Sequence, residues 1–168
     1  MRNKLLKFSL ILLSITIFTA CGETTEPLSD KDIAMNKIVT YSEVGKIKPT
    51  PSDYKLIGIS NVDNENIELV NASVDATDSK GVSDISKIRT LVNNVIEKYN
   101  HAKKYIQNYA DSSNNTQPKV SDYKDMGVTG VTDDNLVHIN RAIDNTSVYY
   151  ASTKSRVQTI VDNVIASL

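Results

Sequence analysis

The chain has 168 residues, of which 19 are basic and 20 acidic, so one or two small domains are expected. This charge balance excludes the basic surface of a nucleic-acid-binding protein, and we expect no nucleic-acid partner. The single cysteine excludes an intramolecular disulfide and a metal site built from several cysteines.

The first 20 residues have the pattern of a cleaved signal peptide. Residues 1–7 carry three basic residues and no acid, and residues 8–20 carry no charge. An uncharged run of this length is too short to span a hydrocarbon core of ~30 Å and suits a signal-peptide core. The run ends at Ala20, directly before Cys21, the only cysteine of the chain.

Phe18-Thr19-Ala20-Cys21 resembles a bacterial lipobox. The resemblance implies cleavage between Ala20 and Cys21 and attachment of palmitate-type acyl chains at Cys21. Two or three chains, at roughly 0.8 kcal/mol per buried CH₂, anchor a protein stably. The alternative is an ordinary signal peptide followed by a free cysteine. In Gram-negative lipoproteins, Asp directly after the lipidated cysteine resembles a signal for retention in the inner membrane. This chain has Gly22 at that position, which favours the outer membrane.

Residues 21–29 are mostly polar and suit a lipidated tether. Removal of residues 1–20 takes away three basic residues and no acid, which leaves 16 basic and 20 acidic residues and a net charge of −4. A weakly acidic body has no electrostatic reason to lie on anionic lipid. We therefore expect membrane contact through the lipid on Cys21 alone.

The segment after the tether predicts a helix over 30–44. Its apolar residues fall near helical spacing, at Ile33, Ile38, Tyr41 and Val44. Ser29 or Asp30 can cap its start, and Gly45 suits the position after its end.

Two shorter helical segments are expected next. Ser52 is the predicted N-cap of a short turn that ends near Gly58. Asp63 is the predicted N-cap of the next helix, whose apolar residues are Ile67, Val70 and Val74. A third helix begins near Ser83, and its apolar stripe continues to Tyr109. Two alternatives stay open for 84–110: one continuous helix about 40 Å long, or two helices with a break at Asn100.

The chain then repeats itself at an offset of 69 residues. Residues 49–96 and 118–165 share 18 identities in 48 positions without a gap, which is far above chance. Ser121 and Thr132 are the N-caps expected in the second copy, and its last helix carries the stripe Val157, Ile160, Val161, Val164, Ile165 and Leu168. A polar loop over 111–119 precedes this copy.

We therefore predict an all-α fold of two tandem small helical-bundle repeats, at 30–98 and 99–168, after a cleaved lipoprotein signal peptide. A strand at 128–132 is the alternative for one segment, because β-branched valine and threonine residues abound there.

The second copy resembles a helical repeat found in tandem in large surface and adhesin-like proteins of Gram-negative bacteria. The motifs that carry the resemblance are Ser121-Asp122-Tyr123, Gly127-Val128-Thr129-Gly130-Val131-Thr132, Asp134-Asn135-Leu136 and Asn140. The likeness covers 104–165 well and 37–96 less well. It implies a small helical bundle that displays or spaces something at a surface, and it implies no enzymatic activity.

The remaining polar residues offer little catalytic chemistry. His101 and His138 lie in different copies without a histidine at the matching position, which favours surface positions. The acids Asp122, Asp125, Asp133 and Asp134 lack the spacing of a calcium loop and suit helix capping better. Phosphate-loop, nucleophile-elbow and zinc-protease patterns are absent from the sequence. We expect no enzyme, no metal and no cofactor.

Tyrosine supplies every aromatic ring after residue 20. Tyr54 and Tyr123 recur between the copies, so we expect both in the core. Tyr149 and Tyr150 replace Lys80-Gly81 of the first copy. This pair is a candidate contact site for a protein partner, since tyrosine suits interfaces, or else it closes the end of the bundle.

These patterns predict a lipid-anchored, non-enzymatic protein of the cell outer membrane that faces the periplasm or the cell surface. It would act as a helical binding or spacer module. The alternative is a small envelope inhibitor or immunity-type lipoprotein that blocks one protein partner.

Overall fold

The computed structural model describes residues 27–44, 47–111 and 116–168, and these ranges contain seven α-helices and no strand. The predicted all-α fold is confirmed. The alternative strand at 128–132 is wrong, because these residues form a loop between two helices. The predicted signal peptide, the cleavage flank Ala20-Cys21, most of the tether and Gly45 lie outside the described residues.

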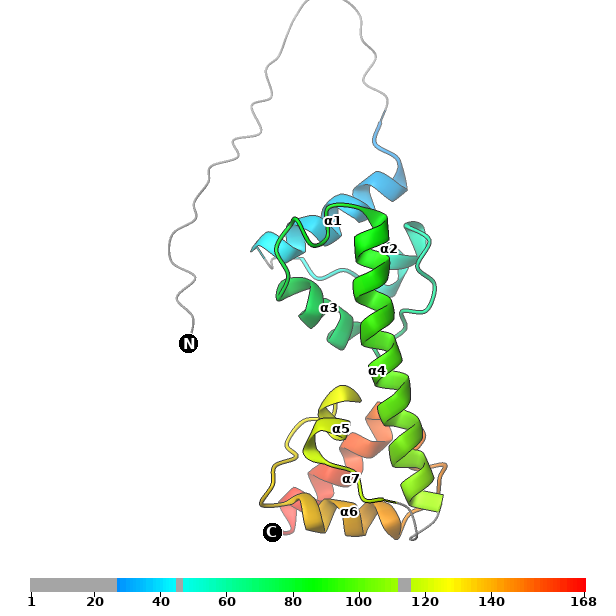
Figure 1. Ribbon diagram of the computed structural model, residues 1–168, viewed down its shortest axis with the longest axis vertical. Coiled ribbons are helices and arrows are strands. Elements are labelled where there is room, and N and C mark those ends of the chain that lie inside the picture. The colour runs from blue at the N-terminus through cyan, green and yellow to red at the C-terminus, as the bar shows by residue number, and fades with distance from the viewer. Residues whose placement is uncertain (1–26, 45–46, 112–115) are drawn as a thin grey trace, which may run out of the picture.

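Two lobes share one long helix (Figure 1). The helices are α1 (Asp30–Val44), α2 (Pro51–Leu56), α3 (Ile67–Asp75), α4 (Ile85–Asp111), α5 (Val120–Asp125), α6 (Leu136–Asp144) and α7 (Lys154–Ala166). Figure 1 shows α1 to α3 in one lobe and α5 to α7 in the other, with α4 running through both. The predicted boundary between residues 98 and 99 falls inside α4.

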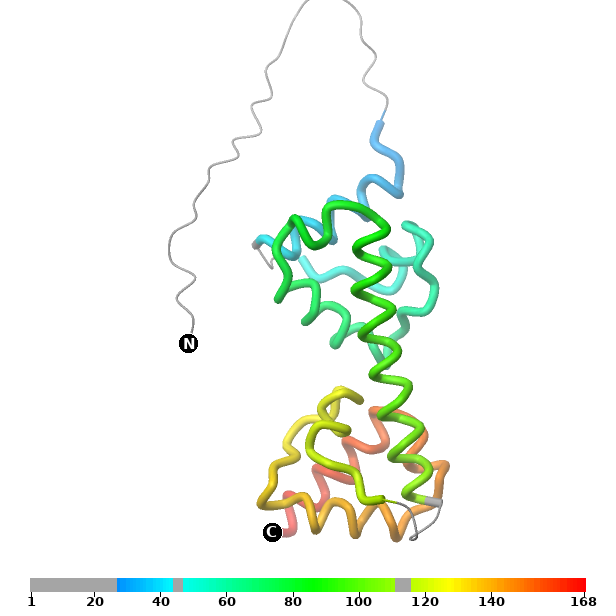
Figure 2. The backbone as a smooth tube through the Cα atoms, in the orientation of Figure 1, coloured from blue at the N-terminus to red at the C-terminus, as the bar shows by residue number. Residues whose placement is uncertain are grey.

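Helix α4 is continuous over 27 residues, about 40 Å, so of the two alternatives the single helix is correct and no break occurs at Asn100. Its buried residues lie mainly three or four positions apart and so share one face, at Ile88, Val92, Ile96, Tyr99, Ala102, Ile106, Tyr109 and Ala110. The first three belong to the core of the first lobe and the other five to the core of the second. The unbroken tube through this segment is visible in Figure 2.

Helix α1 has the predicted bounds but buries a different stripe. Ala34, Ile38 and Tyr41 are buried in the first core, at the spacing i, i+4, i+7. Ile33 is 53% exposed, so its expected place on the apolar face is wrong. At 100° per residue Ile33 lies far round the helix from Ile38, whereas Ala34 lies one turn before it.

The short helices α2 and α5 begin one residue before the predicted caps, and their N-cap residues lie two residues before them. Thr50 and Lys119 occupy the N-cap positions, which places Ser52 and Ser121 inside the first turn. The carboxylate of Asp53 accepts the backbone N–H of Thr50 at 2.7 Å, and Asp122 accepts that of Lys119 at 2.7 Å. At each N-terminus the side chain of an acid at the third helical position therefore accepts the backbone N–H of the N-cap residue. A serine cap works in the reverse direction, because its side chain at the N-cap accepts an N–H from inside the helix.

An asparagine precedes each of the middle helices α3 and α6. Asn66 accepts the N–H of Asp63 at 3.0 Å and donates to the carbonyl of Asn61 at 3.1 Å. Asn135 binds Thr132 and Gly130 in the same way, at 2.9 and 2.8 Å. The N-caps are thus Asn66 and Asn135 rather than the predicted Asp63 and Thr132.

A buried tyrosine organises each core, as predicted. The hydroxyl of Tyr54 donates to Asn71 at 2.9 Å, and the Asn71 amide donates to the Pro49 carbonyl at 2.8 Å. The corresponding contacts in the second lobe are Tyr123 to Asn140 at 2.6 Å and Asn140 to Pro118 at 2.8 Å. Both hydroxyls are buried and hydrogen-bonded. Each tyrosine therefore links its short helix, α2 or α5, to the middle helix of the same lobe, and the asparagine links that middle helix to the segment before the short helix.

Ala102→Pro tests the continuity of α4. Proline removes a backbone hydrogen bond and clashes with the preceding turn, so we expect the free energy of unfolding to fall by about 3 kcal/mol or more. The measurement is urea unfolding of residues 22–168 followed by circular dichroism.

Ala102→Gly is the matched control for that variant. Glycine keeps the hydrogen bond, and its helix propensity costs only about 1 kcal/mol relative to alanine. Equal stability of the proline variant and the wild type would contradict a continuous α4.

Candidate functional site

The loop between α6 and α7, residues 145–153, carries the predicted contact residues. It contains no charged side chain and consists mainly of Asn, Thr, Ser and Tyr. Its turn is fixed by the N–H of Tyr150, which donates to the Ser147 carbonyl at 2.9 Å. Thr153 ends the loop by accepting the N–H of Arg156 at 3.3 Å, which caps α7.

Tyr149 and Tyr150 are 61% and 57% exposed. Their rings meet edge to face, with centroids 5.2 Å apart and planes at 82°. This is a favourable arrangement for two aromatic rings, since the edge of one meets the electron-rich face of the other. Ala151, the next residue, is fully buried and anchors the loop to the second core. The tyrosine pair therefore lies on the surface and does not fill the end of the bundle.

Arg156 of α7 holds Tyr149 in place. Its guanidinium carbon lies 3.8 Å from the centroid of the Tyr149 ring, a cation–π contact. Nη1 donates to the Tyr149 carbonyl at 2.9 Å and to Ser152 Oγ at 2.7 Å. Nη2 donates to the Tyr149 hydroxyl at 2.7 Å. Four contacts from one side chain fix both the loop and the ring.

The first lobe holds its corresponding loop with a lysine. Lys87, at the position of Arg156, donates to the Lys80 carbonyl and to Ser83 Oγ, each at 3.0 Å. Its ammonium also lies 3.7 Å from the carboxylate of Asp84. Thr153 stands at the position of Asp84, and none of the ion pairs between described residues includes Arg156. The second lobe thus keeps the turn but loses the acid that balances the cation.

The lobes touch at Leu69 of α3. This side chain belongs to the first lobe by sequence but packs against the second core. Gly127 makes room for it, because a Cβ there would lie 3.2 Å from Leu69 Cγ and the backbone φ is +78°. The sequence analysis missed Leu69, since its matching residue in the second lobe is the exposed His138.

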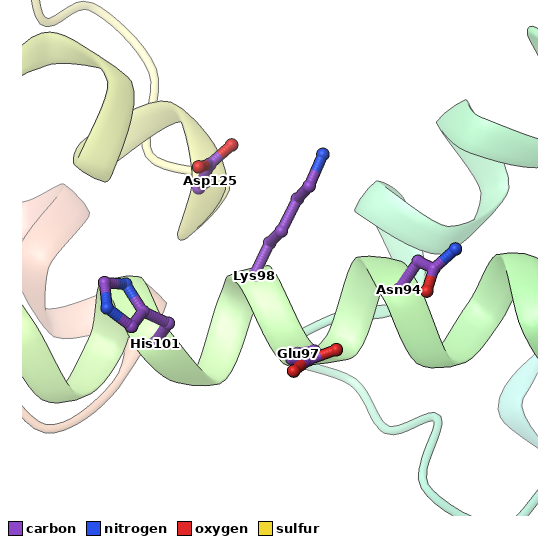
Figure 3. A pocket seen from close by; sticks show the side chains of 5 residues that line it. All are labelled: Asn94, Glu97, Lys98, His101 and Asp125. Carbon is purple, nitrogen blue, oxygen red and sulfur yellow. The ribbon is translucent and has the colours of Figure 1, made fainter.

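A shallow groove follows this junction along α4 (Figure 3). Its volume is about 460 Å³, and its lining residues are Asn94, Glu97, Lys98, His101 and Asp125. Figure 3 shows Lys98 pointing away from α4 into the space between Asp125 and Asn94. All the α4 residues of this lining are exposed, and His101 stacks on Tyr105 at 6.3 Å. The arrangement brings no catalytic acid, base and nucleophile into hydrogen-bond contact.

Of the predicted surface histidines and acids, His101 and Asp125 line the same groove. His138 is exposed on α6, and Asp122 serves as a capping acid on α5. Within the described ranges, no three His, Cys, Asp or Glu side chains gather in a way that would hold a metal ion. None of the helices described is both long and apolar enough to cross a membrane.

Tyr99 couples the two lobes electrostatically. It is buried in the second core, and burial raises the pKa of its phenol to about 12, with the carboxylates of Glu65 and Asp63 acting in the same direction. Both acids belong to the α2–α3 loop of the first lobe. The Tyr99 hydroxyl and Glu65 Oε2 are buried without a hydrogen-bond partner among the described residues.

Comparison with protein-family models, with curated proteins and with solved structures finds no match to this chain. The resemblance of residues 104–165 to helical repeats of surface proteins therefore stays a prediction from the sequence. The function is inferred below from the contacts that the residues of this chain make.

Stability should fall at alkaline pH because of the buried tyrosines. The folded-state pKa of Tyr99 lies above the unfolded value of about 10, so its contribution is complete below pH 10 and is lost as the pH rises toward 12. Burial raises the pKa of Tyr54 and Tyr123 in the same direction. Urea unfolding at pH 8 and pH 11 should show a loss of about 1 kcal/mol from Tyr99 alone.

Tyr99→Phe isolates this contribution. Because the hydroxyl has no partner, the variant should match the wild type at pH 8 to within about 0.5 kcal/mol and lose less stability than the wild type at pH 11. An identical loss in both proteins would show that Tyr99 does not titrate differently in the folded state.

Proposed function

We propose that this chain is a lipid-anchored, non-enzymatic binding module of the bacterial outer membrane. Cys21 carries the lipid, and Tyr149 and Tyr150 contact a protein partner. The observation that carries the proposal is the tyrosine pair, which is more than half exposed although Arg156 holds the Tyr149 ring and Tyr150 packs edge to face against that ring. An exposed ring that is already ordered before binding loses less conformational entropy when a partner binds.

The anchor is supported by the order of features at the start of the chain. Three basic residues precede an uncharged run, and the only cysteine follows that run directly after Ala20. A mature net charge of −4 gives the body no attraction to anionic lipid, so acyl chains on Cys21 would supply the membrane affinity.

The spacing role is supported by the path of the chain between anchor and contact site. The tether leads into α1 of the first lobe, whereas the tyrosine pair belongs to the loop before α7 in the second lobe. Helix α4 connects the two lobes over about 40 Å. Figure 1 shows α1 and α7 in lobes at opposite ends of this helix, so a rigid α4 would hold the lobe that carries the loop before α7 away from the lipid surface.

Cys21→Ser tests the anchor. Without the thiol no diacylglycerol can be attached, so the variant should leave the detergent-soluble membrane fraction and migrate differently from the mature wild type. Cell fractionation followed by immunoblotting measures both effects.

Thr24→Ser, a conservative change within the tether, is the control and should fractionate like the wild type. A Cys21→Ser protein that stays in the membrane fraction with unchanged migration would overturn the lipoprotein proposal.

A further inference from the structure

We infer that the face formed by Tyr149, Tyr150 and Arg156 binds an acidic segment of a protein partner. A carboxylate of that segment would pair with Arg156, and an apolar side chain beside it would pack on the tyrosine rings. The inference rests on the proposed function, because it specifies the chemistry of the partner at the same contact site.

The unbalanced charge of Arg156 is the first argument. In the first lobe the matching cation, Lys87, lies 3.7 Å from Asp84. In the second lobe Thr153 stands at the place of that acid, and it still caps the helix, so the change leaves the fold intact but removes the negative charge. The loop 145–153 supplies no other charge. A cation without its acid beside an exposed apolar surface is complementary to a carboxylate.

The donors of Arg156 are the second argument. A guanidinium has five N–H groups, and three hydrogen bonds from Arg156 go to the Tyr149 carbonyl, Ser152 Oγ and the Tyr149 hydroxyl. Two N–H groups are left for a partner, which is enough for a carboxylate. The stacked and hydrogen-bonded side chain is already ordered, so little rotamer entropy is lost when the carboxylate binds.

The apolar part of the face is the third argument. Val148 precedes the tyrosine pair and is 37% exposed, so three consecutive residues present apolar surface. Serine, threonine and asparagine make up most of the rest of the loop. Rigid tyrosines among small hydrogen-bonding residues are the composition of antibody binding loops, which recognise protein surfaces.

A neutral glycan fits this face less well than an acidic peptide. Sugars stack on an open aromatic face, and the guanidinium of Arg156 covers one face of Tyr149 at 3.8 Å. A neutral glycan also leaves the charge of Arg156 unpaired. The cation and the ring together therefore favour a carboxylate beside an apolar group.

The test uses the full chain in detergent and a fluorescently labelled random copolymer of glutamate and tyrosine as the probe. We expect saturable binding by fluorescence anisotropy that weakens as salt is added. Because the mature chain has a net charge of −4, a polyanion has no general attraction to it, and binding must be local.

Thr153→Asp is the decisive variant. It restores the acid of the first lobe beside Arg156 and retains a residue that caps helices well, so the protein should fold normally while the copolymer binds at least tenfold more weakly. Combined Tyr149→Ser and Tyr150→Ser, which remove both rings without adding a charge, should also weaken binding, because the apolar side chain beside the carboxylate loses its packing surface. Lys87→Gln, at the matching position of the first lobe, should leave binding unchanged.

Thermal unfolding of each variant ensures that lost binding does not reflect a lost fold. Unchanged affinity of Thr153→Asp, or no saturable binding of the copolymer at millimolar concentration, would overturn the inference. Binding of a neutral oligosaccharide such as maltoheptaose at this face, without binding of the copolymer, would also overturn it. Failure of the Cys21→Ser experiment would reject the anchor alone and leave the copolymer result standing.

Discussion

The apolar face of α4 is the constraint on which the rest of the structure depends. Eight residues of this helix are buried, and three of them belong to the first core and five to the second. Neither set of short helices buries much surface alone, since α2 and α5 have six residues each and α3 and α6 have nine. Both sets are stabilised by packing against the same long helix.

Sharing one helix also fixes how the two lobes meet. Since the helix does not bend freely at its centre, Leu69 can reach the second core, and Gly127 leaves the space that this side chain fills. Glu65 comes close enough to raise the pKa of Tyr99 across the same junction. The loop between α6 and α7, which we propose as the contact site, therefore belongs to a lobe whose orientation follows from α4. With a flexible joint in place of this helix, the position of the tyrosine pair relative to the proposed anchor would vary in distance and direction.

The sequence predicted the features that depend on periodicity and missed those that depend on partners. The bounds of α1 and the apolar stripe along α4 follow from apolar residues at helical spacing, which one segment reveals alone, whereas the continuity of α4 at Asn100 stayed open. Ile33 was misplaced because Ala34, a small residue, takes the buried position. Ser52 and Ser121 were misassigned as caps because Asp53 and Asp122 close these helices from the third position.

The sequence also revealed only part of the candidate site, because it shows the residues of a loop and not the side chains that contact them. A mismatch between the two copies singled out Tyr149 and Tyr150, and the structure places both on the surface. The role of Arg156 was missed, although the replacement of Asp84 by Thr153 was visible in the aligned copies. Only the fold brings Arg156 over the Tyr149 ring, seven residues away along the chain. Leu69 was missed because helical spacing shows which apolar residues share a face of a helix and does not show which of the two cores a residue packs against.

The central claim, that α4 is one rigid helix between two cores, is tested most directly by amide hydrogen exchange of the Cys21→Ser chain. The amides of residues 96–103 lie at the crossing between the lobes, where Tyr99 and Ala102 are buried. We predict that they are protected as strongly as the amides around Val92 and Ile106 in the two cores. Rapid exchange of residues 96–103 while both cores stay protected would contradict the account and would mean two lobes on a flexible joint.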